Sequence, residues 1–310
     1  MTKTKKQHYV PQFLLRKFAT KSKKNPQIWA LDKKTQTVRL SSIRDVAHEN
    51  NFYEYSSSNG SRINLENLMA GIDGIGARIV RQIIESGKLL LSKEDRIWFS
   101  CFIACQMSRT PMIRKDMENL RQMIIHKWGP NVRAMGDDRP IGSLSPDDAK
   151  ASSLLHLQDV PEFAKIIESK VWTISEAPKD CPFIIGDNPV TRTNMIKRRF
   201  RGNLGLNNKG IELYMPLSPK YCIHIICPIL AEAVLRTPEL ADVYINAITT
   251  GSPISLLPEN AEFANSLQVI WSERFVYGRE VSHLDTPLDM LRTNPELIEG
   301  PGVRQRPEDA

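Results

Sequence analysis

The sequence predicts an α+β fold, and two observations carry that prediction. Apolar residues recur at helical spacing through most of residues 62–169, whereas residues 170–280 hold short strand-like runs bounded by Pro, Gly and Asn. These segments come in blocks rather than in strict β-α-β alternation, which favours α+β. We therefore expect a single domain over residues 1–285, with a helix-rich half at 62–169 and a sheet-rich half at 170–280. Residues 286–310 hold four prolines in 25 positions, and we expect a flexible tail there.

A small β unit is predicted at residues 27–55, ahead of the helical block. The runs IWALD and TVRLS flank a four-residue turn at 33–36, and NFYEY is a third strand-like run. A helix follows from about residue 64 to about residue 84, and three glycines weaken it: Gly71, Gly74 and Gly76. The chain should thus pass from a short sheet into its first long helix.

A strongly apolar helix is predicted at the centre of the helical block. Ser92 and Asp95 resemble a capping box at its start. Its body, IWFSCFIACQM, is apolar nearly all round, which is typical of a buried helix. Pro111 should end or kink this helix just after Arg109, because proline removes a backbone hydrogen bond. Helical spacing resumes after Pro111, and a further helix should run from Ser145 to about residue 169.

The sheet-rich half contains four runs with β character, namely VWTISEA, PFIIGD, IELYMPL and YCIHIICP. Two helical stretches follow them, PELADVYINAI and NAEFANSLQVIWSERFVYG. We therefore expect an antiparallel or mixed sheet with flanking helices.

The charge of the chain is basic and unevenly distributed. Lys and Arg number 42 against 35 Asp and Glu, which gives a formal net charge of +7. The first 24 residues contain basic residues and no acidic ones, and a second basic cluster consists of Lys197, Arg198, Arg199 and Arg201. Such clusters suit a polyanionic partner, and we expect these four side chains to contact nucleic acid. The alternative is an ordinary solvated face with a basic tail.

Targeting signals are not evident in the sequence. No run approaches the roughly 18 apolar residues that a membrane helix needs, and no apolar segment follows the basic N-terminus. The five cysteines fit reduced core residues better than a disulfide framework. We therefore expect a cytoplasmic protein without a membrane partner; the oligomeric state is left open.

Four motifs resemble those of a known family. HYVPQFLLRKF at the N-terminus, FIACQMSRTP at 102–111, FIIGDNPV at 183–190 and MPLSP at 215–219 are similar, in the same order, to the family named domain of unknown function 4238. The one departure is Lys17, where a polar residue such as Asn is expected. The resemblance implies no established activity. It does imply these signature positions: His8, Tyr9, Pro11, Arg109, Thr110, Pro111, Asp187, Asn188 and Pro189.

Three of the signature segments contain residues suited to chemistry. His8 could act as a general base or a metal ligand, and Asp187 with Asn188 follows a predicted strand, where a carboxylate is well placed to bind a metal. Arg109 could clamp a phosphate. Each has a structural alternative: a hydrogen-bonded ring for His8, an Asx turn for Asp187, and for Arg109 a salt bridge to Asp187 or Glu66.

Our first hypothesis is that His8, Arg109 and Asp187, with Asn188, share one cleft as a metal-assisted phosphodiester hydrolase acting on nucleic acid. A divalent metal would be held by Asp187 and His8. The first alternative is a non-catalytic module that binds nucleic acid or a protein, in which the signature docks the N-terminus onto the core.

A second alternative is a HEPN-like ribonuclease, because Arg121 and His126 have its R-x4-H spacing. The sequence contains no Walker loop, GxGxxG after a strand, GxSxG elbow or HExxH motif, which disfavours nucleotide-driven, Rossmann-type and serine-hydrolase chemistry.

Overall fold

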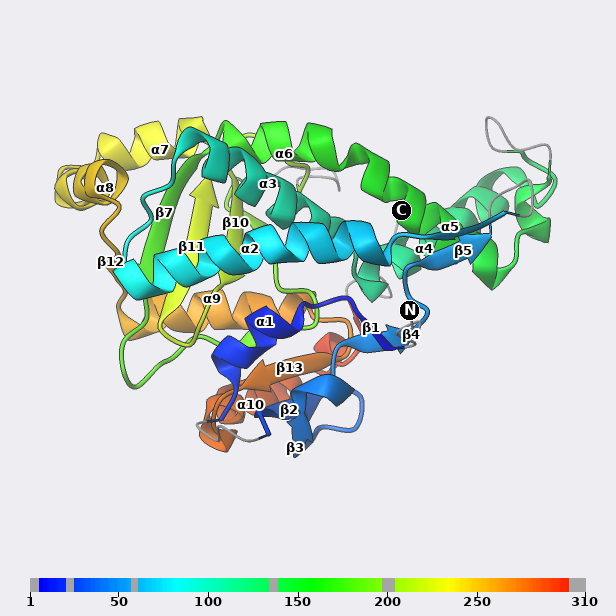
Figure 1. The fold of residues 1–310 in the computed structure, drawn as a ribbon, viewed down its shortest axis with the longest axis horizontal. Coiled ribbons are helices and arrows are strands. Elements are labelled where there is room, and N and C mark those ends of the chain that lie inside the picture. Colours follow the sequence, from blue (N-terminus) through cyan, green and yellow to red (C-terminus); the bar gives the residue numbers. More distant parts are fainter. Residues whose placement is uncertain (1–5, 21–24, 57–60, 134–138, 197–203, 301–310) are drawn as a thin grey trace.

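The computed structural model describes residues 6–20, 25–56, 61–133, 139–196 and 204–300. It confirms the α+β prediction, with short strands near the N-terminus, a central group of helices and a mixed sheet (Figure 1). Helices α2 (Glu66–Ser86) and α3 (Lys93–Ser108) cross one face of the larger sheet, α9 (Pro258–Trp271) runs beside it, and a smaller sheet lies below (Figure 1). Within the described ranges, no helix has both the length and the apolar character needed to cross a membrane.

The larger sheet has five strands in the order β12-β7-β11-β10-β9. All neighbours are antiparallel except β12 and β7, so the sheet is mixed, as predicted. Its apolar face packs against the central helices; Trp172 of β7, for example, lies 6.0 Å from the ring of Phe99 in α3. The strands are β7 Val171–Glu176, β9 Thr191–Asn194, β10 Ile211–Pro216, β11 Tyr221–Ile226 and β12 Ile254–Ser255.

Helix α3 (Lys93–Ser108) is the predicted buried helix from Phe99 onward, whereas Ile97 and Trp98 at the start of the apolar run are exposed. The Ser92 side chain accepts a hydrogen bond from the Asp95 amide at its start, and the helix ends before Arg109. Helix α2 (Glu66–Ser86) packs closely on it, because a Cβ atom at Gly76 would lie only 2.5 Å from the Phe102 ring. Pro111 then occupies the first turn of α4 (Pro111–Trp128), where its missing amide costs no hydrogen bond.

The smaller sheet corrects the predicted N-terminal β unit. Strands β2 (Gln27–Asp32) and β3 (Thr37–Ser42) pair as expected, but β2 also pairs with β13 (Phe275–Gly278), which pairs with β8 (Ile185–Gly186). The third predicted strand joins a different sheet, since β5 (Glu54–Ser56) pairs with β6 (Arg62–Asn64). The sequence FVYG, predicted as the end of a helix, is β13, because its backbone pairs with β2 on one side and with β8 on the other.

Lys33, in the turn predicted at 33–36, is fully buried. Its ammonium donates hydrogen bonds to the carbonyls of Val269 and Ser272, 2.9 and 2.7 Å away, at the C-terminal end of α9 (Pro258–Trp271). A cation at that end of a helix satisfies carbonyls that lack partners within the helix. Lys33 therefore fastens the β2–β3 turn to α9.

The C-terminal segment is not a flexible tail over its described length. Residues Asp285–Thr293 form α10 and Pro295–Leu297 form a 3-10 turn, with Leu291 and Leu297 buried against the smaller sheet. Apolar residues at helical spacing offset the prolines on which the prediction rested, and Pro287 lies within the first turn, where proline is tolerated. Residues 301–310 lie outside the described ranges.

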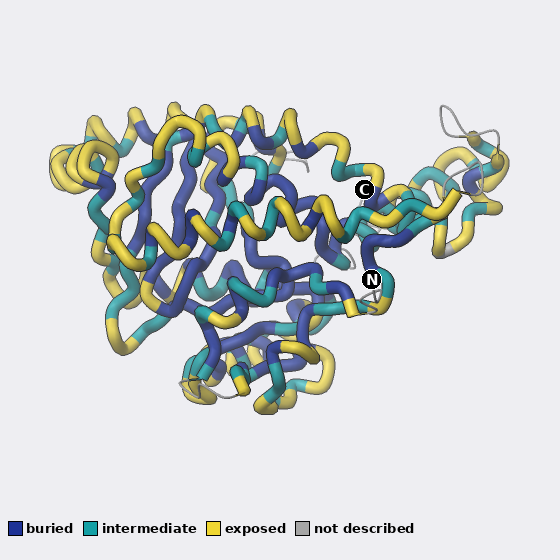
Figure 2. Tube along the Cα trace, in the orientation of Figure 1, coloured by how far each residue is buried: buried dark blue, intermediate teal, exposed yellow. Residues whose placement is uncertain are grey.

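Of the remaining elements, α6 lies beside α3, and the others lie near the N-terminus or at the two ends of the molecule (Figure 1). Burial is greatest in the strands and in the helices facing them, whereas the α7–α8 hairpin is largely exposed (Figure 2). These elements are β1 Lys6–His8, α1 Gln12–Leu15, β4 His48–Asn50, α5 Pro146–Leu155, α6 Val160–Glu168, α7 Pro228–Leu235 and α8 Pro238–Thr250.

Candidate functional site

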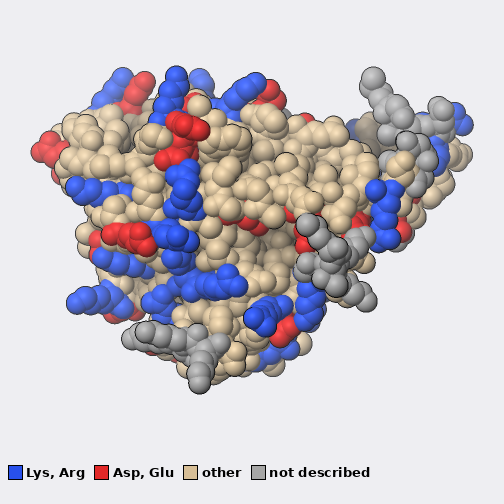
Figure 3. Space-filling view, viewed as in Figure 1, with Lys and Arg blue, Asp and Glu red and all other residues tan. Residues whose placement is uncertain are grey.

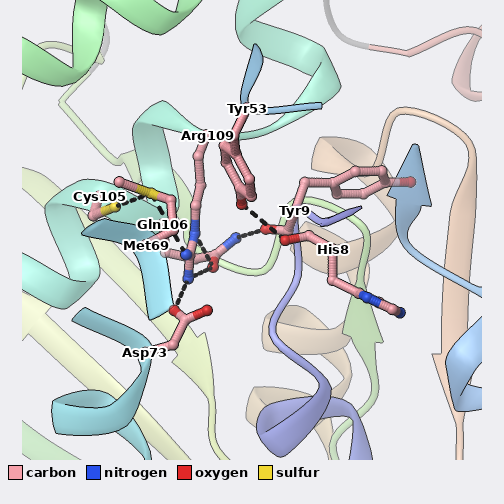
Figure 4. A network of polar contacts seen from close by, with 8 residues as sticks. All are labelled: His8, Tyr9, Tyr53, Met69, Asp73, Cys105, Gln106 and Arg109. Atoms are coloured by element: carbon pink, nitrogen blue, oxygen red, sulfur yellow. Dashed lines mark hydrogen bonds and ion pairs between the residues drawn. The ribbon is translucent and has the colours of Figure 1, made fainter. Parts of the chain in front are cut away.

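The N-terminal signature is tied to the core through its backbone. Tyr53 donates its hydroxyl to the His8 carbonyl, 2.8 Å away, and Gln106 of α3 donates its side-chain amide to the Tyr9 carbonyl, 3.0 Å away (Figure 4). Gln7 accepts a hydrogen bond from the Tyr53 amide at 2.7 Å and donates one to Glu66 at 3.1 Å. The chain terminus is thus fixed to α2 and α3 by buried polar contacts.

The His8 ring is held by two neighbouring residues, Ile43 and Gln12. Its Nε2 lies 3.3 Å from the Ile43 carbonyl and its Nδ1 lies 3.4 Å from the Gln12 amide, so a neutral ring donates from Nε2 and accepts at Nδ1. Burial lowers the pKa of His8 to about 4. The ring also points away from the Arg109 guanidinium (Figure 4). A ring with this pKa is a poor base near neutral pH.

Arg109 forms an internal salt bridge, which was the predicted alternative to a phosphate clamp. Its partner, however, is neither Asp187 nor Glu66. Its side chain is fully buried and its Nη2 lies 2.5 Å from Asp73 of α2. Two further hydrogen bonds, of 3.0 and 2.8 Å, reach the Gln106 side-chain oxygen. The predicted partners were wrong, because Glu66 binds Gln7 and Asp187 binds backbone amides. Arg109 thus fastens the end of α3 to α2.

Asp187 caps a turn in the smaller sheet. Its carboxylate accepts hydrogen bonds from the backbone amides of Glu273, Arg274 and Phe275 at 2.7–2.8 Å. Burial raises the pKa of Asp187 to about 6, and these hydrogen bonds oppose the increase. Asn188 donates to the Trp271 carbonyl at 3.3 Å. Both side chains therefore join the end of β8 to the segment that links α9 and β13.

The three signature segments converge, but the three predicted side chains do not make a shared site. Among the described residues, no hydrogen bond or ion pair joins any two of His8, Arg109 and Asp187. Tyr9 is bound to the second segment, since its carbonyl accepts a hydrogen bond from Gln106, and burial together with the Asp187 charge raises the pKa of its phenol. Within the same ranges, no group of three or more His, Cys, Asp or Glu side chains is arranged to hold a metal ion.

The other predicted functional residues lie elsewhere. Arg121 is bound to Glu118 at 2.6 Å and to the Ile141 carbonyl at 3.3 Å, and His126 is exposed one and a half turns further along α4. Nothing in this arrangement brings the two side chains together. The predicted nucleic-acid contacts lie outside the described residues: Lys197, Arg198, Arg199 and Arg201.

A cleft that the sequence did not predict lies where α3 and α4 meet β9. It encloses about 340 Å³ and is lined by Ser108 of the SRTP motif, by Arg192 of β9, by His156 and Phe163, and by the loop at 205–208. Register places Arg192 opposite Leu213 of β10, which fixes its backbone. The cleft thus borders one signature motif, FIACQMSRTP, and a residue that follows a second, FIIGDNPV, by two positions.

The environment of Arg192 distinguishes this cleft. Its guanidinium lies 5.0 Å from the Trp271 ring and donates one long hydrogen bond, of 3.4 Å, to the Leu204 carbonyl. Across the described residues, no carboxylate lies within 4.0 Å of Arg192, and burial lowers its pKa, with the more distant Asp116 opposing that change. A largely buried cation without a close counterion favours the arrival of an anion.

One signal in the sequence could have identified Arg192. It follows the FIIGDNPV motif by two residues and is the only charged residue of the strand TRTN. An isolated charge beside a signature motif has the same character that drew attention to Arg109. The two arginines differ in their partners, which depend on packing between distant segments.

Together the fold and the cleft define a mixed α+β protein with an internally bonded signature and an arginine-lined cleft. A family model described as protein of unknown function (DUF4238) matches residues 6–282, so the chain belongs to that family. Neither a curated protein nor a solved structure matches the chain.

Proposed function

We propose that this protein is a binding module for nucleic acid, and that a backbone phosphate binds at Arg192. The observation that carries the proposal is the Arg192 guanidinium, which lines the cleft while largely buried and without a carboxylate within 4.0 Å in the described chain. Guanidinium binds phosphate oxygens through two parallel hydrogen bonds, and such charge-assisted bonds are the strong ones. A phosphate would supply the negative charge that this site lacks.

The other walls of the cleft suit a nucleotide. A volume of about 340 Å³ lies at the lower end of the range for small-ligand pockets. His156 and Phe163 pack edge to face with ring centroids 5.3 Å apart and both line the cleft, so they present ring surfaces on which a base can stack. Single-stranded nucleic acid exposes its bases for such stacking, and it is the form that we propose.

The charge distribution supports this site more than it supports a broad basic surface. On the face shown in Figure 3, Lys and Arg lie over and around α2, interspersed with Asp and Glu. In the sequence, however, the basic cluster at 197–201 lies between Arg192 and the loop at 205–208. Arg192 and that loop both line the cleft. This cluster therefore begins and ends within a few residues of the proposed phosphate site. It would add sequence-independent affinity.

We do not extend the proposal to metal-assisted hydrolysis. His8 has a depressed pKa, Arg109 is engaged by Asp73, and the Asp187 oxygens accept three backbone hydrogen bonds. The signature therefore has a structural role in this proposal, and the cleft has the binding role. Metal-dependent cleavage of an oligonucleotide that is lost in Asp187→Ala, while that variant stays folded, would restore the hydrolase hypothesis.

The test compares Arg192→Gln with Arg81→Gln in binding to an oligothymidylate of about 12 nucleotides. Both substitutions remove one positive charge, but Arg81 is exposed on α2 and does not line the cleft. We expect Arg192→Gln to weaken binding roughly tenfold or more, since charged hydrogen bonds contribute about 1.5–3 kcal/mol. The slope of the logarithm of the binding constant against the logarithm of the salt concentration should be shallower by about 0.7 than in the wild type. This is the value for one phosphate contact on a single strand.

Arg81→Gln should stay close to the wild type in both affinity and salt slope. Thermal melts of both variants would show that the fold is intact. Equal losses in the two variants would contradict the proposed site, and no binding by the wild type at low salt would contradict the proposed function.

A further inference from the structure

One apolar face of α4 begins at the Arg192 cleft and becomes exposed as the helix proceeds. Ile113, near the start of α4, is buried and lines the cleft. Leu120, seven residues later, is 50% exposed, and Trp128, at the end of the helix, is 62% exposed. Residues three, four and seven apart lie on the same face of a helix. We call this face the α4 stripe, and its members are Ile113, Met117, Leu120, Ile124 and Trp128.

The neighbouring helix α5 packs on a different face of α4. A second cleft, of about 310 Å³, lies between the two helices and is lined by Arg114, Glu118 and Arg121 of α4 and by Ala149 of α5. At about 100° per residue, these three positions on α4 lie roughly 80–140° around the helix from Ile113. Helix α5 therefore packs beside the α4 stripe and leaves its outer half accessible.

The outer end of the α4 stripe combines an exposed aromatic ring with a cation. The Lys127 ammonium lies 4.9 Å from the centre of the Trp128 ring. Exposed aromatic rings stack on bases, and a neighbouring ammonium can neutralise a phosphate of the same strand. Helix α4 as a whole carries four Lys and Arg side chains against two Asp and Glu. Its excess of positive charge and its exposed ring are therefore complementary to nucleic acid, which offers both phosphates and bases.

We infer that a single strand bound at Arg192 continues along the α4 stripe and stacks a base on Trp128. The inference rests on the proposed function, because the Arg192 cleft fixes the point where the strand begins to follow α4. The distance from Ile113 to Trp128 along the helix is about 22 Å, at about 1.5 Å per residue. A stacked strand advances about 3.4 Å per nucleotide, so about six or seven nucleotides cover that distance. The full site should therefore need a longer strand than the cleft alone can hold.

The experiment measures the affinity of two oligothymidylates by titration calorimetry, a trinucleotide and a strand of about 12 nucleotides. The trinucleotide can occupy the cleft but is too short to reach Trp128, whereas the longer strand spans the α4 stripe. Trp128→Ala should weaken binding of the longer strand roughly tenfold, the effect of losing one stacked base, and should leave the trinucleotide unaffected. Trp128→Phe keeps an aromatic ring and should bind the longer strand within about threefold of the wild type.

Trp98→Ala is the matched control for the loss of an exposed tryptophan. Trp98 lies on α3, is 43% exposed and belongs neither to the α4 stripe nor to the lining of the cleft. This variant should bind both oligonucleotides as the wild type does. Thermal melts of the three variants would show that the fold is intact.

The outcomes separate this inference from the proposed function. If Arg192→Gln weakens binding of the longer strand and Trp128→Ala does not, or if Trp128→Ala weakens both lengths equally, the path along α4 is overturned and the Arg192 site stands. A changed oligomeric state of Trp128→Ala in light scattering, with unchanged affinity, would also overturn the path and assign the α4 stripe to a second copy of the chain. Binding that depends on Trp128 but not on Arg192, or no wild-type binding at low salt, would overturn both.

Discussion

Replacing Arg109 by alanine is the perturbation that best separates a structural signature from a functional one. The substitution removes an ion pair of 2.5 Å whose guanidinium is fully buried, together with two hydrogen bonds to Gln106. Removing one partner of a buried pair costs about 3–5 kcal/mol, because the other charge is left uncompensated. Asp73 is 24% exposed, so solvent relieves part of this cost. We expect a loss near the lower end, about 3 kcal/mol.

The assay is equilibrium urea unfolding followed by circular dichroism, with Arg78→Ala as the matched control. Arg78 of α2 pairs with Asp95 of α3 at 2.5 Å, so it joins the same two helices, but its side chain is 55% exposed. Exposed pairs contribute little, and this control should lose only a small fraction of what Arg109→Ala loses.

A second comparison uses the partner of Arg109. Asp73→Ala and the double variant complete a mutant cycle, and the two changes should be strongly non-additive. The reasoning is refuted if Arg109→Ala unfolds at the same urea concentration as the wild type. It is also refuted if that variant keeps its stability but loses oligonucleotide binding, because Arg109 would then be a ligand-binding residue.

Two other predictions concern α2 and His8. Gly76→Ala should destabilise the protein by about 1–3 kcal/mol, because the new methyl group would collide with Phe102; Gly74→Ala, which meets open space on the same helix, should stabilise it by about 0.5–1 kcal/mol. Denaturation midpoints measure both. For His8, the folded pKa of about 4 lies below the ordinary 6.5, so stability should fall as pH decreases from about 6.5 to about 4. His8→Gln should lose about 1–2 kcal/mol less over that interval, a value reduced from 1.36 kcal/mol per pKa unit because the ring is partly solvated. The measurement is the free energy of unfolding of the wild type and of His8→Gln as a function of pH. If both lose the same amount between about pH 6.5 and about pH 4, this prediction is contradicted.

Much of the local structure could be predicted from the sequence, because it depends on residues near one another in the chain. The buried helix α3 follows from its nearly continuous apolar run, and its start follows from the Ser92 side chain. Helix α2 forms despite its glycines because Gly76 allows close packing, which offsets a weak helix propensity. The mixed sheet also follows from the four predicted β runs.

Features that depend on distant segments were missed. The sequence predicts Lys33 only as a turn residue. Its bonds to the C-terminal end of α9 depend on how the distant segments pack. The sequence FVYG was predicted as the end of a helix. It forms a strand because β2, which is distant in the sequence, supplies its hydrogen-bonding partner. In the same way, the charges of His8, Arg109 and Asp187 suggested a shared site, whereas each is satisfied by a separate partner from a distant part of the chain. The Arg192 cleft was missed because its distinguishing feature is the lack of a close counterion.

The pairing of β2 with β13 sets a condition on the synthesis of this protein. Asp32 pairs with Phe275, so β2 leaves the ribosome long before its partner strand exists. At ordinary rates of translation the delay is roughly 10–50 s. Throughout it, β2 presents an unpaired edge that other chains can join, and the Lys33 ammonium has no helix end to cap. Pairing over such a sequence separation is also slow.

A nascent chain of this kind would depend on being kept apart from its neighbours until the last strand emerges. Truncation anywhere before β13 would make that exposed edge permanent.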